Sequence, residues 1–105
     1  MEKQVKIIWK GEEVDVVLGP INFGEYKKIR RKSIVIRDFD GKPHQFRDVD
    51  LYEDLRTLFS IKEAPFPKTL ESLYSLSLTD GSILEEAAIE VNAKDVIGRG
   101  KNSVN

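Results

Sequence analysis

The chain has 105 residues, of which 40% are hydrophobic and 33% are charged. This length suits one domain with a single core, and the apolar content is too high for a wholly disordered chain. The chain contains no cysteine, which excludes disulfides, thiolate metal sites and cysteine nucleophiles. The formal net charge of -1 disfavours a polycation that coats nucleic acid. A high charged fraction without cysteine also fits a thermophilic source.

The charge is unevenly distributed along the chain. Residues 1–49 carry 11 Lys/Arg against 8 Asp/Glu, residues 50–91 carry 3 against 9, and residues 92–105 carry 3 against 1. A basic first half therefore precedes an acidic second half. This polarity favours weak self-association or a charged, asymmetric partner, and raised salt should weaken either contact.

No targeting or membrane segment is visible in the sequence. The first apolar run, Ile7-Ile8-Trp9, is shorter than the roughly 7–15 apolar residues at the centre of a signal peptide. It is far shorter than the roughly 20 residues of a membrane helix. We therefore expect a cytoplasmic protein that makes no membrane contact.

Two alternating segments open the chain. Residues 4–10 and 14–18 each alternate apolar and polar side chains, which is the pattern of half-buried strands. Gly11-Glu12-Glu13 provides a turn between them, and Gly19-Pro20 ends the second strand because proline cannot donate to a ladder. The sequence predicts an N-terminal antiparallel β-hairpin.

A short helix is predicted over residues 22–32. Asn22 is a suitable N-cap, and Glu25 stands where a capping-box partner would stand. Ile21 and Tyr26 occupy the two positions of a hydrophobic staple. Apolar side chains then recur at helical spacing as far as Ile29.

Residues 33–49 permit two interpretations. The β-branched run Ile34-Val35-Ile36 favours a strand, and Asp40-Gly41-Lys42-Pro43 is a turn signal. We therefore predict a second hairpin over residues 33–39 and 44–49. The alternative is a single helix that continues from residue 22 to Arg37.

The second half of the chain is predicted to be helical. Asp50, Thr69 and Ser82 are the expected caps of three helices, with Glu53 and Glu85 as capping partners of the first and last. The proline-containing segment 63–67 should end the first helix, and residues 79–81 should separate the second from the third. The inner stripe of the first is Leu51, Leu55, Leu58 and Phe59, and that of the last is Leu84, Ala87, Ala88 and Val91.

Together these elements predict an α+β fold, in which one or two N-terminal antiparallel β-hairpins precede a cluster of short α-helices. Residues 1–94 should form a single domain. Residues 95–105 are polar and glycine-bearing, and we expect them to be a disordered tail.

Templates for catalytic and metal sites fail along this chain. His44 is the only histidine, and we interpret it as a turn residue beside Pro43. Asp38–Gly41 resembles the start of a calcium loop, but Lys42 and Pro43 break the pattern. The segment 98–101 lacks the glycine and the Ser/Thr of a phosphate-binding loop. We expect no catalytic residue, no metal and no cofactor, and hence no enzyme.

A basic run stands out in the predicted helix 22–32. Five of six residues are cationic: Lys27, Lys28, Arg30, Arg31 and Lys32. This run is either a solvated helix end that complements the helix dipole, or a docking patch for nucleic acid or an acidic protein. Nucleic acid is the less favoured ligand, because no aromatic stacking motif accompanies the run.

Several segments resemble one family. The stretch 60–66, "SIKEAPF", ends one helix, Thr69 begins a short leucine-rich helix, and a final helix closes near Glu90-Val91-Asn92. With the hairpin around residues 11–14 and the helix start at residues 22–25, the chain resembles the small tail assembly chaperones of tailed phages and prophages. The resemblance covers residues 5–92.

The resemblance implies a non-enzymatic protein that acts in the host-cell cytoplasm. Such chaperones bind the long tape-measure protein during tail assembly, keep its apolar helices soluble and help to recruit tail-tube subunits. Many members are extended by translational frameshifting near the C-terminus, and the Gly100-Lys101 segment is a candidate place for it. An apolar surface is required for this task, and the candidate residues are Tyr52, Phe59, Phe66, Leu70, Leu73 and Tyr74.

Two rival functions remain open at this point. The first is a binding module that uses the basic run on nucleic acid or on an acidic protein. The second is a host enzyme subunit or regulator, which would require a concave pocket with convergent polar groups.

Overall fold

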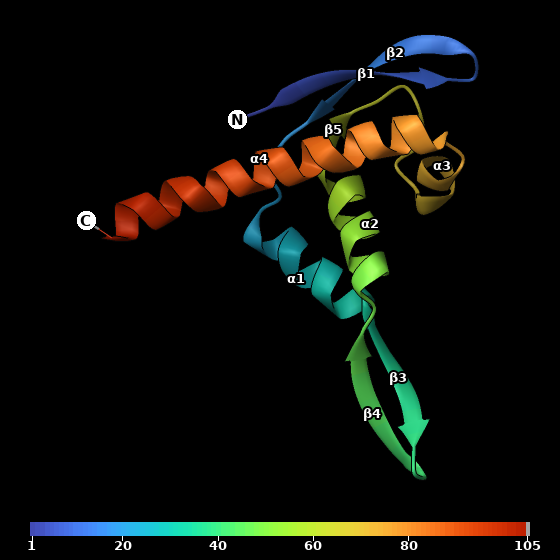
Figure 1. Cartoon of the computed structure of the whole chain (residues 1–105), viewed down its shortest axis with the longest axis vertical. Helices are drawn as coiled ribbons and strands as arrows, with labels where there is room; N and C mark the ends of the chain where they lie inside the picture. The colour runs from blue at the N-terminus through green and yellow to red at the C-terminus, as the bar shows by residue number, and fades with distance from the viewer. Residues whose placement is uncertain (105) are drawn as a thin grey trace.

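The computed structural model describes the backbone of residues 1–104 and the side chains of residues 1–93 (Figure 1). Strands and short helices alternate before one long C-terminal helix. In chain order the elements are β1 (Lys3–Trp9), β2 (Glu12–Leu18), α1 (Phe23–Lys32), β3 (Ile34–Phe39), β4 (Lys42–Arg47), α2 (Val49–Ser60), β5 (Ile61–Glu63), α3 (Leu70–Tyr74) and α4 (Leu78–Val104). The predicted α+β class, with an N-terminal hairpin followed by short helices, is confirmed.

The N-terminal hairpin forms as predicted, with a tighter turn. Lys3 pairs with Leu18 and Trp9 pairs with Glu12, so only Lys10 and Gly11 remain in the turn. Both turn residues have positive φ, 51° and 81°, as a two-residue turn between twisted strands requires. The predicted turn at residues 11–13 was therefore too long, because Glu12 and Glu13 belong to β2.

Helix α1 begins where the capping box predicts. The side chain of Asn22 accepts a hydrogen bond from the Glu25 backbone N–H at 2.8 Å, and the Glu25 carboxylate accepts one from the Asn22 backbone N–H at 3.0 Å. The helix ends at Lys32 and Ser33 caps it. The alternative helix that continues to Arg37 is wrong, because β3 begins at Ile34.

Strands β3 and β4 form the predicted second hairpin, which we call the arm (residues 34–47), but β4 covers Lys42–Arg47 and not residues 44–49. Asp40 and Gly41 make its turn with φ values of 52° and 76°. Figure 1 shows the arm leading away from the body, at the end opposite β1 and β2. At its base the Asp48 backbone N–H donates to the Ser33 carbonyl at 2.7 Å, which fixes the point where the arm leaves the body.

Helix α2 differs from the prediction at both ends. Its N-cap is Asp48 rather than Asp50, because the Asp48 carboxylate accepts from the Leu51 backbone N–H at 3.0 Å. The helix ends at Ser60, before the prolines, and the chain continues as β5, which was not predicted. This short strand pairs with β2 and places the Ile61 side chain in the core.

Helix α3 is capped by Thr69 as predicted, but the expected break before the last helix is absent. Helix α4 begins at Leu78, so residues 79–81 lie inside it. The hydroxyl of Ser77 accepts from the Asp80 backbone N–H at 3.1 Å and donates to the Asp80 carboxylate at 2.7 Å. This arrangement starts the helix early, and Ser82 with Glu85 is therefore a pair within the helix, not a capping box.

The core lies where α4 crosses the sheet. The predicted stripe of α4 is buried, and with it lie side chains from β1, β2, β5 and the segment around α3. Trp9 packs beside this core, with its ring centroid 4.9 Å from that of Phe66. The buried hydrophobic residues of the cluster are Ile7, Val16, Leu18, Ile61, Phe66, Leu73, Leu84, Ala87 and Ala88, and Val91 is buried in the next turn of α4.

The predicted tail and the predicted absence of a membrane segment concern the chain as a whole. The predicted tail, residues 95–105, lies outside the residues whose side chains are described, and the domain boundary at residue 94 stays a prediction. Within the described residues, no helix combines the length and the apolar character needed to cross a membrane.

One side chain joins three parts of the fold. The Asn92 carbonyl oxygen accepts from the Ile21 backbone N–H at 2.9 Å, just before α1. Its amide nitrogen donates to the Ser60 hydroxyl at 3.0 Å, at the end of α2, and to the Ala88 carbonyl at 2.7 Å. Asn92 therefore ties α4 to the segments that carry α1 and α2.

We predict that Asn92→Ala lowers the free energy of unfolding by about 1–3 kcal/mol, because it leaves the partly buried Ile21 N–H without its acceptor. Urea denaturation followed by the fluorescence of Trp9, the single tryptophan, measures the change. Ser82→Ala, at an exposed position of the same helix, is the control and should stay within about 0.5 kcal/mol of the parent. An equal loss in both variants would contradict the role of Asn92.

Candidate interaction surfaces

Three of the six predicted apolar contact residues belong to the core or pack against it. Phe66 and Leu73 are buried, and Leu70 is partly buried against the same cluster. Side chains in these positions stabilise the fold through burial and cannot meet a partner while the core is intact. Helical spacing of leucines was the signal that selected them, and a core helix produces the same signal.

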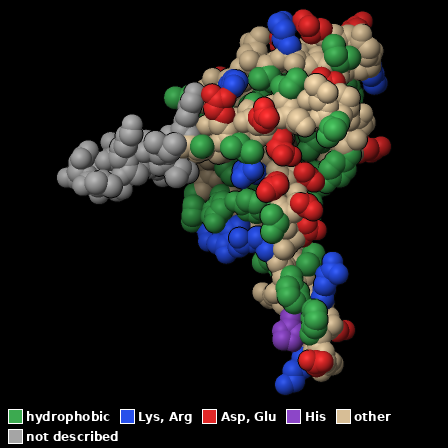
Figure 2. Space-filling view, viewed as in Figure 1, with side chains coloured by type: hydrophobic (Ala, Val, Ile, Leu, Met, Phe, Trp, Pro, Cys, Tyr) green, Lys and Arg blue, Asp and Glu red, His purple; other side chains and the backbone are tan. Residues whose placement is uncertain are grey.

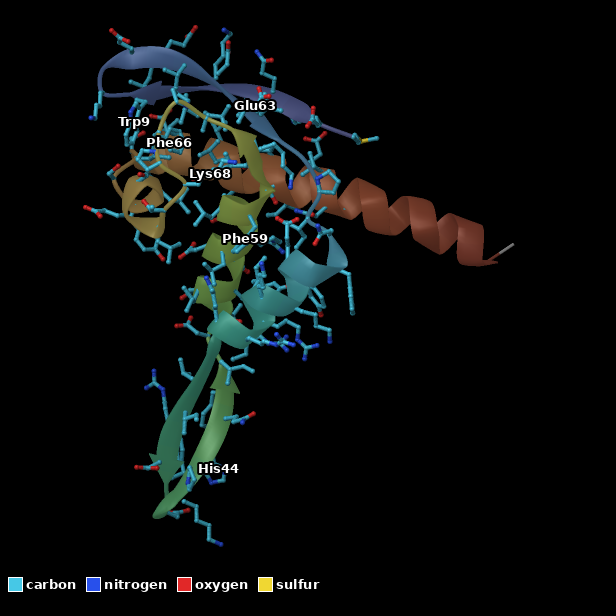
Figure 3. All side chains as sticks on the ribbon, turned by 180° about the vertical axis from the view of Figure 1, so that it is seen from behind. Trp9, His44, Phe59, Glu63, Phe66 and Lys68 are labelled. Carbon is cyan, nitrogen blue, oxygen red and sulfur yellow. The ribbon has the colours of Figure 1, made fainter. Side chains whose placement is uncertain are left out.

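The other three lie nearer the surface, at separate places. Tyr52 is half-buried and meets Tyr26 of α1 edge-on, with ring centroids 6.5 Å apart. Phe59 is half-buried in a hollow of about 250 Å³ that Lys62 and Lys68 also line (Figure 3). Tyr74 is exposed on α3. The structure thus distributes the six residues and does not bring them together in one groove.

The basic run covers the outer surface of α1, where Lys and Arg gather in Figure 2. Lys28 and Arg31 are exposed. The other three cations each lie over an aromatic ring: Lys27 over Phe23 at 5.2 Å, Arg30 over Tyr26 at 5.7 Å and Lys32 over Phe59 at 5.9 Å. Aromatic rings therefore do accompany the run: Phe23 and Tyr26 come from α1 itself, and Phe59 comes from α2.

The arm is the part of the molecule most exposed to solvent. Its two strands pack mainly on each other, and all of their residues except the half-buried Val35 are exposed. Ile36 is 67% and Phe39 is 55% accessible, and Ile34 and Phe46 are exposed as well. Large apolar side chains in such positions are normally covered by another surface.

The pairing register divides the arm into two chemically different faces, because successive side chains of a strand point to opposite sides. The aromatic face consists of Val35, Arg37, Phe39, Lys42, His44 and Phe46. The aliphatic face consists of Ile34, Ile36, Asp38, Pro43, Gln45 and Arg47. Neither face is wholly polar, so the arm lacks the polar, water-facing side that a simple surface hairpin would have.

The aromatic face holds a small cluster of rings. The centroids of Phe39 and Phe46 are 5.6 Å apart, and His44 lies 6.1 Å from Phe39 and 6.5 Å from Phe46. His44 is a strand residue opposite Arg37 and not a turn residue as predicted, and Figure 3 shows it far along the arm. Among the described residues, no group of three His, Asp or Glu side chains is placed to hold a metal ion.

A second hollow, of about 220 Å³, lies between α2, α3 and α4. Its apolar lining comes from Leu73, Leu76 and Leu78, and the carboxylates of Asp54 and Glu85 flank it. The Tyr74 hydroxyl donates to Asp54 at 2.7 Å. That hydrogen bond to a carboxylate raises the pKa of Tyr74 to about 12, with smaller contributions from burial and from nearby acidic charge. We call this site the acidic hollow.

The sequence did contain a signal for the arm. Ile34, Val35 and Ile36 are consecutive apolar residues in a strand, so at least one of them must lie on each face. That pattern indicates a strand that is covered on both sides. In this molecule neither side is covered, which distinguishes the arm from the N-terminal hairpin.

We predict that Tyr74 ionises late in alkaline titration, with a pKa raised to about 12. The hydrogen bond to Asp54 contributes stability up to about pH 10, the ordinary tyrosine pKa, and this contribution disappears between about pH 10 and 12. Tyrosinate absorbance measures the steps, and Tyr74→Phe assigns the late one. In Asp54→Asn the step should move back toward the ordinary value, and an unmoved step would refute the assignment.

Comparison with protein-family models, curated proteins and solved structures yields no match for this chain. The function must therefore be argued from the surfaces that its own residues form. The arm, the basic run of α1 and the acidic hollow are the candidates.

Proposed function

We propose that this protein is a non-enzymatic assembly chaperone that binds the tape-measure protein of a phage-like tail. The observation that supports this proposal is the arm, which exposes apolar side chains on both faces. In this role the protein needs no catalytic residue and no cofactor, and it acts in the cytoplasm of the host cell while tails are assembled.

The energetics of the arm favour a binding role. A two-stranded hairpin without further support is marginally stable in water. Covering its apolar side chains gains roughly 25 cal/mol for each Å² removed from water. A partner that lies along the arm therefore stabilises the hairpin, and its own apolar surface is shielded from water. A chaperone of an apolar, helical protein must provide this shielding.

We assign the tape-measure contact to the aliphatic face. Ile34 and Ile36 lie on this face beside the uncharged Pro43 and Gln45. Its charged side chains are one carboxylate, Asp38, and one guanidinium, Arg47. Aliphatic side chains pack against the apolar stripe of a helix without requiring a specific polar partner. Such a surface suits a long partner on which similar helical segments recur, and tail-tube subunits could then be recruited to the assembled complex.

The resemblance over residues 60–73 supports the same proposal through the fold. These residues form the end of α2, β5, the proline segment and most of α3, and Ile61, Phe66 and Leu73 among them are buried. In this interpretation the resembling segment shapes the body that presents the arm. The contact with the partner is then made elsewhere, by residues 34–47.

The test is co-purification with the tape-measure protein of a phage-like tail. Ile34→Ser combined with Ile36→Ser should weaken the complex at least about tenfold, because both side chains lose apolar area that the partner covers. Ile89→Ser is the matched control, since Ile89 is an exposed isoleucine of α4. If the parent protein does not bind, or if the variant with Ile34→Ser and Ile36→Ser binds as tightly as the parent and the control, the proposal fails.

A second candidate function is binding of nucleic acid or an acidic protein through the basic run. The observation in its favour is that Lys28 and Arg31 are exposed beside cations held over aromatic rings. This function predicts affinity for a single-stranded oligonucleotide that falls steeply between about 50 and 200 mM salt, and that Lys28→Glu with Arg31→Glu abolishes. Negligible binding by the parent at low salt excludes the nucleic-acid form of this function.

A further inference from the structure

The aromatic face of the arm and the acidic hollow are complementary surfaces of the same chain. We propose that the arm of one copy docks by its aromatic face into the acidic hollow of a second copy. The inference concerns association of the protein with itself, and it does not depend on the identity of any other partner.

The aromatic face provides a cationic and apolar plug. Its ionisable side chains are Arg37, Lys42 and His44, whereas the arm's carboxylates are placed elsewhere: Asp38 on the aliphatic face and Asp40 in the turn. Phe39 and Phe46 form an exposed pair of rings on the same face as the cations Arg37 and Lys42. Val35, Arg37, Phe39 and Phe46 of this face also line a hollow of about 440 Å³, together with Asp48 and Asp50 at the start of α2.

The acidic hollow provides the matching socket. Leu78 at its mouth is 89% accessible, and beneath it the lining is formed by Leu76, which is partly buried, and by the edge of the buried Leu73. Asp54 and Glu85 are the charged side chains of the lining, and no cationic side chain contributes to it within the described residues. The volume of about 220 Å³ suits the entry of an aromatic ring and little more.

The arm cannot reach the hollow of its own chain. It leaves the body at the N-terminal end of α2 and points away, whereas α3 and the start of α4 lie to the side of α2, toward its other end (Figure 1). The contact must therefore join two molecules and two different surfaces. Such a heterologous contact produces a reciprocal pair, a ring or an open chain of copies, depending on the rotation between neighbours.

Charge complementarity favours this occupant over an unrelated one. The basic plug and the acidic hollow carry opposite charge, and both have an apolar centre, so docking removes apolar area from water while opposite charges approach. Exposed charge pairs are screened by salt, since the Debye length falls from about 10 Å at 0.1 M to about 3 Å at 1 M. Self-association should therefore be strongest at low ionic strength.

The first experiment is sedimentation velocity of the full chain over a range of concentrations. We expect association that strengthens with concentration at about 50 mM salt and weakens several-fold at about 500 mM salt. A protein that sediments as a monomer throughout the micromolar to millimolar range, at low salt, would overturn the proposal.

Two variants separate the two surfaces. The arm variant combines Arg37→Glu with Lys42→Glu, and the hollow variant combines Leu78→Gln with Glu85→Lys. Each variant alone should be monomeric, because either its plug or its socket is lost. Lys10→Glu is the matched control: it reverses an exposed cation in the turn between β1 and β2, outside both surfaces, and should associate like the parent. Circular dichroism confirms that each variant is folded.

Mixing the two variants provides the decisive test. The hollow variant keeps a native arm and the arm variant keeps a native hollow, so one native contact can form between them. An equimolar mixture should therefore give a 1:1 heterodimer and no larger species. A mixture that stays monomeric, or single variants that associate like the parent, would refute the proposed contact.

The design also separates this inference from the proposed function. Tape-measure binding is tested on Ile34 and Ile36 of the aliphatic face, whereas self-association is tested on Arg37 and Lys42 of the aromatic face. If self-association fails and co-purification succeeds, only the docking model is lost. The opposite result removes the chaperone proposal and leaves the contact between copies in place.

Discussion

The position of every other element depends on how α4 packs across the sheet. Leu84 packs among the buried side chains of the strands, and the small Ala87 and Ala88 in the same core let the helix backbone approach the sheet closely. This apolar contact fixes the position of α4. The hydrogen bonds of Asn92 then join α4 to the end of α2 and to the segment just before α1. The arm emerges between these two helices, so its direction is set by a contact on the far side of the molecule.

The sequence predicted well those features that depend on local chemistry. The Asn22–Glu25 capping box, the Thr69 cap and the stripe of α4 all depend on spacing within a few residues, and the structure contains each of them. The errors arose where two local signals competed. Ser77 caps α4, so the helix has already begun when the chain reaches Ser82. Gly81 is tolerated inside the helix because the buried stripe of α4 continues beyond it.

The candidate site was harder to predict, for a physical reason. Periodicity reports which side chains are apolar on one face of an element, but it does not report whether another element covers that face. Phe66 and Leu73 were selected as contact residues by the property that places them in the core, whereas Ile36 and Phe39 were assigned to a hairpin without any role. Only the tertiary arrangement distinguishes a covered apolar face from an uncovered one.

The arm also presents two open strand edges, and their chemistry limits what the protein can become. Pro43 removes one backbone donor from β4, and the charged side chains of Arg37, Lys42 and Arg47 stand along six-residue strands. Short, charged, proline-bearing edges resist the addition of further strands. The arm can therefore offer its faces to a helix or a hollow while its edges discourage growth into a continuous sheet.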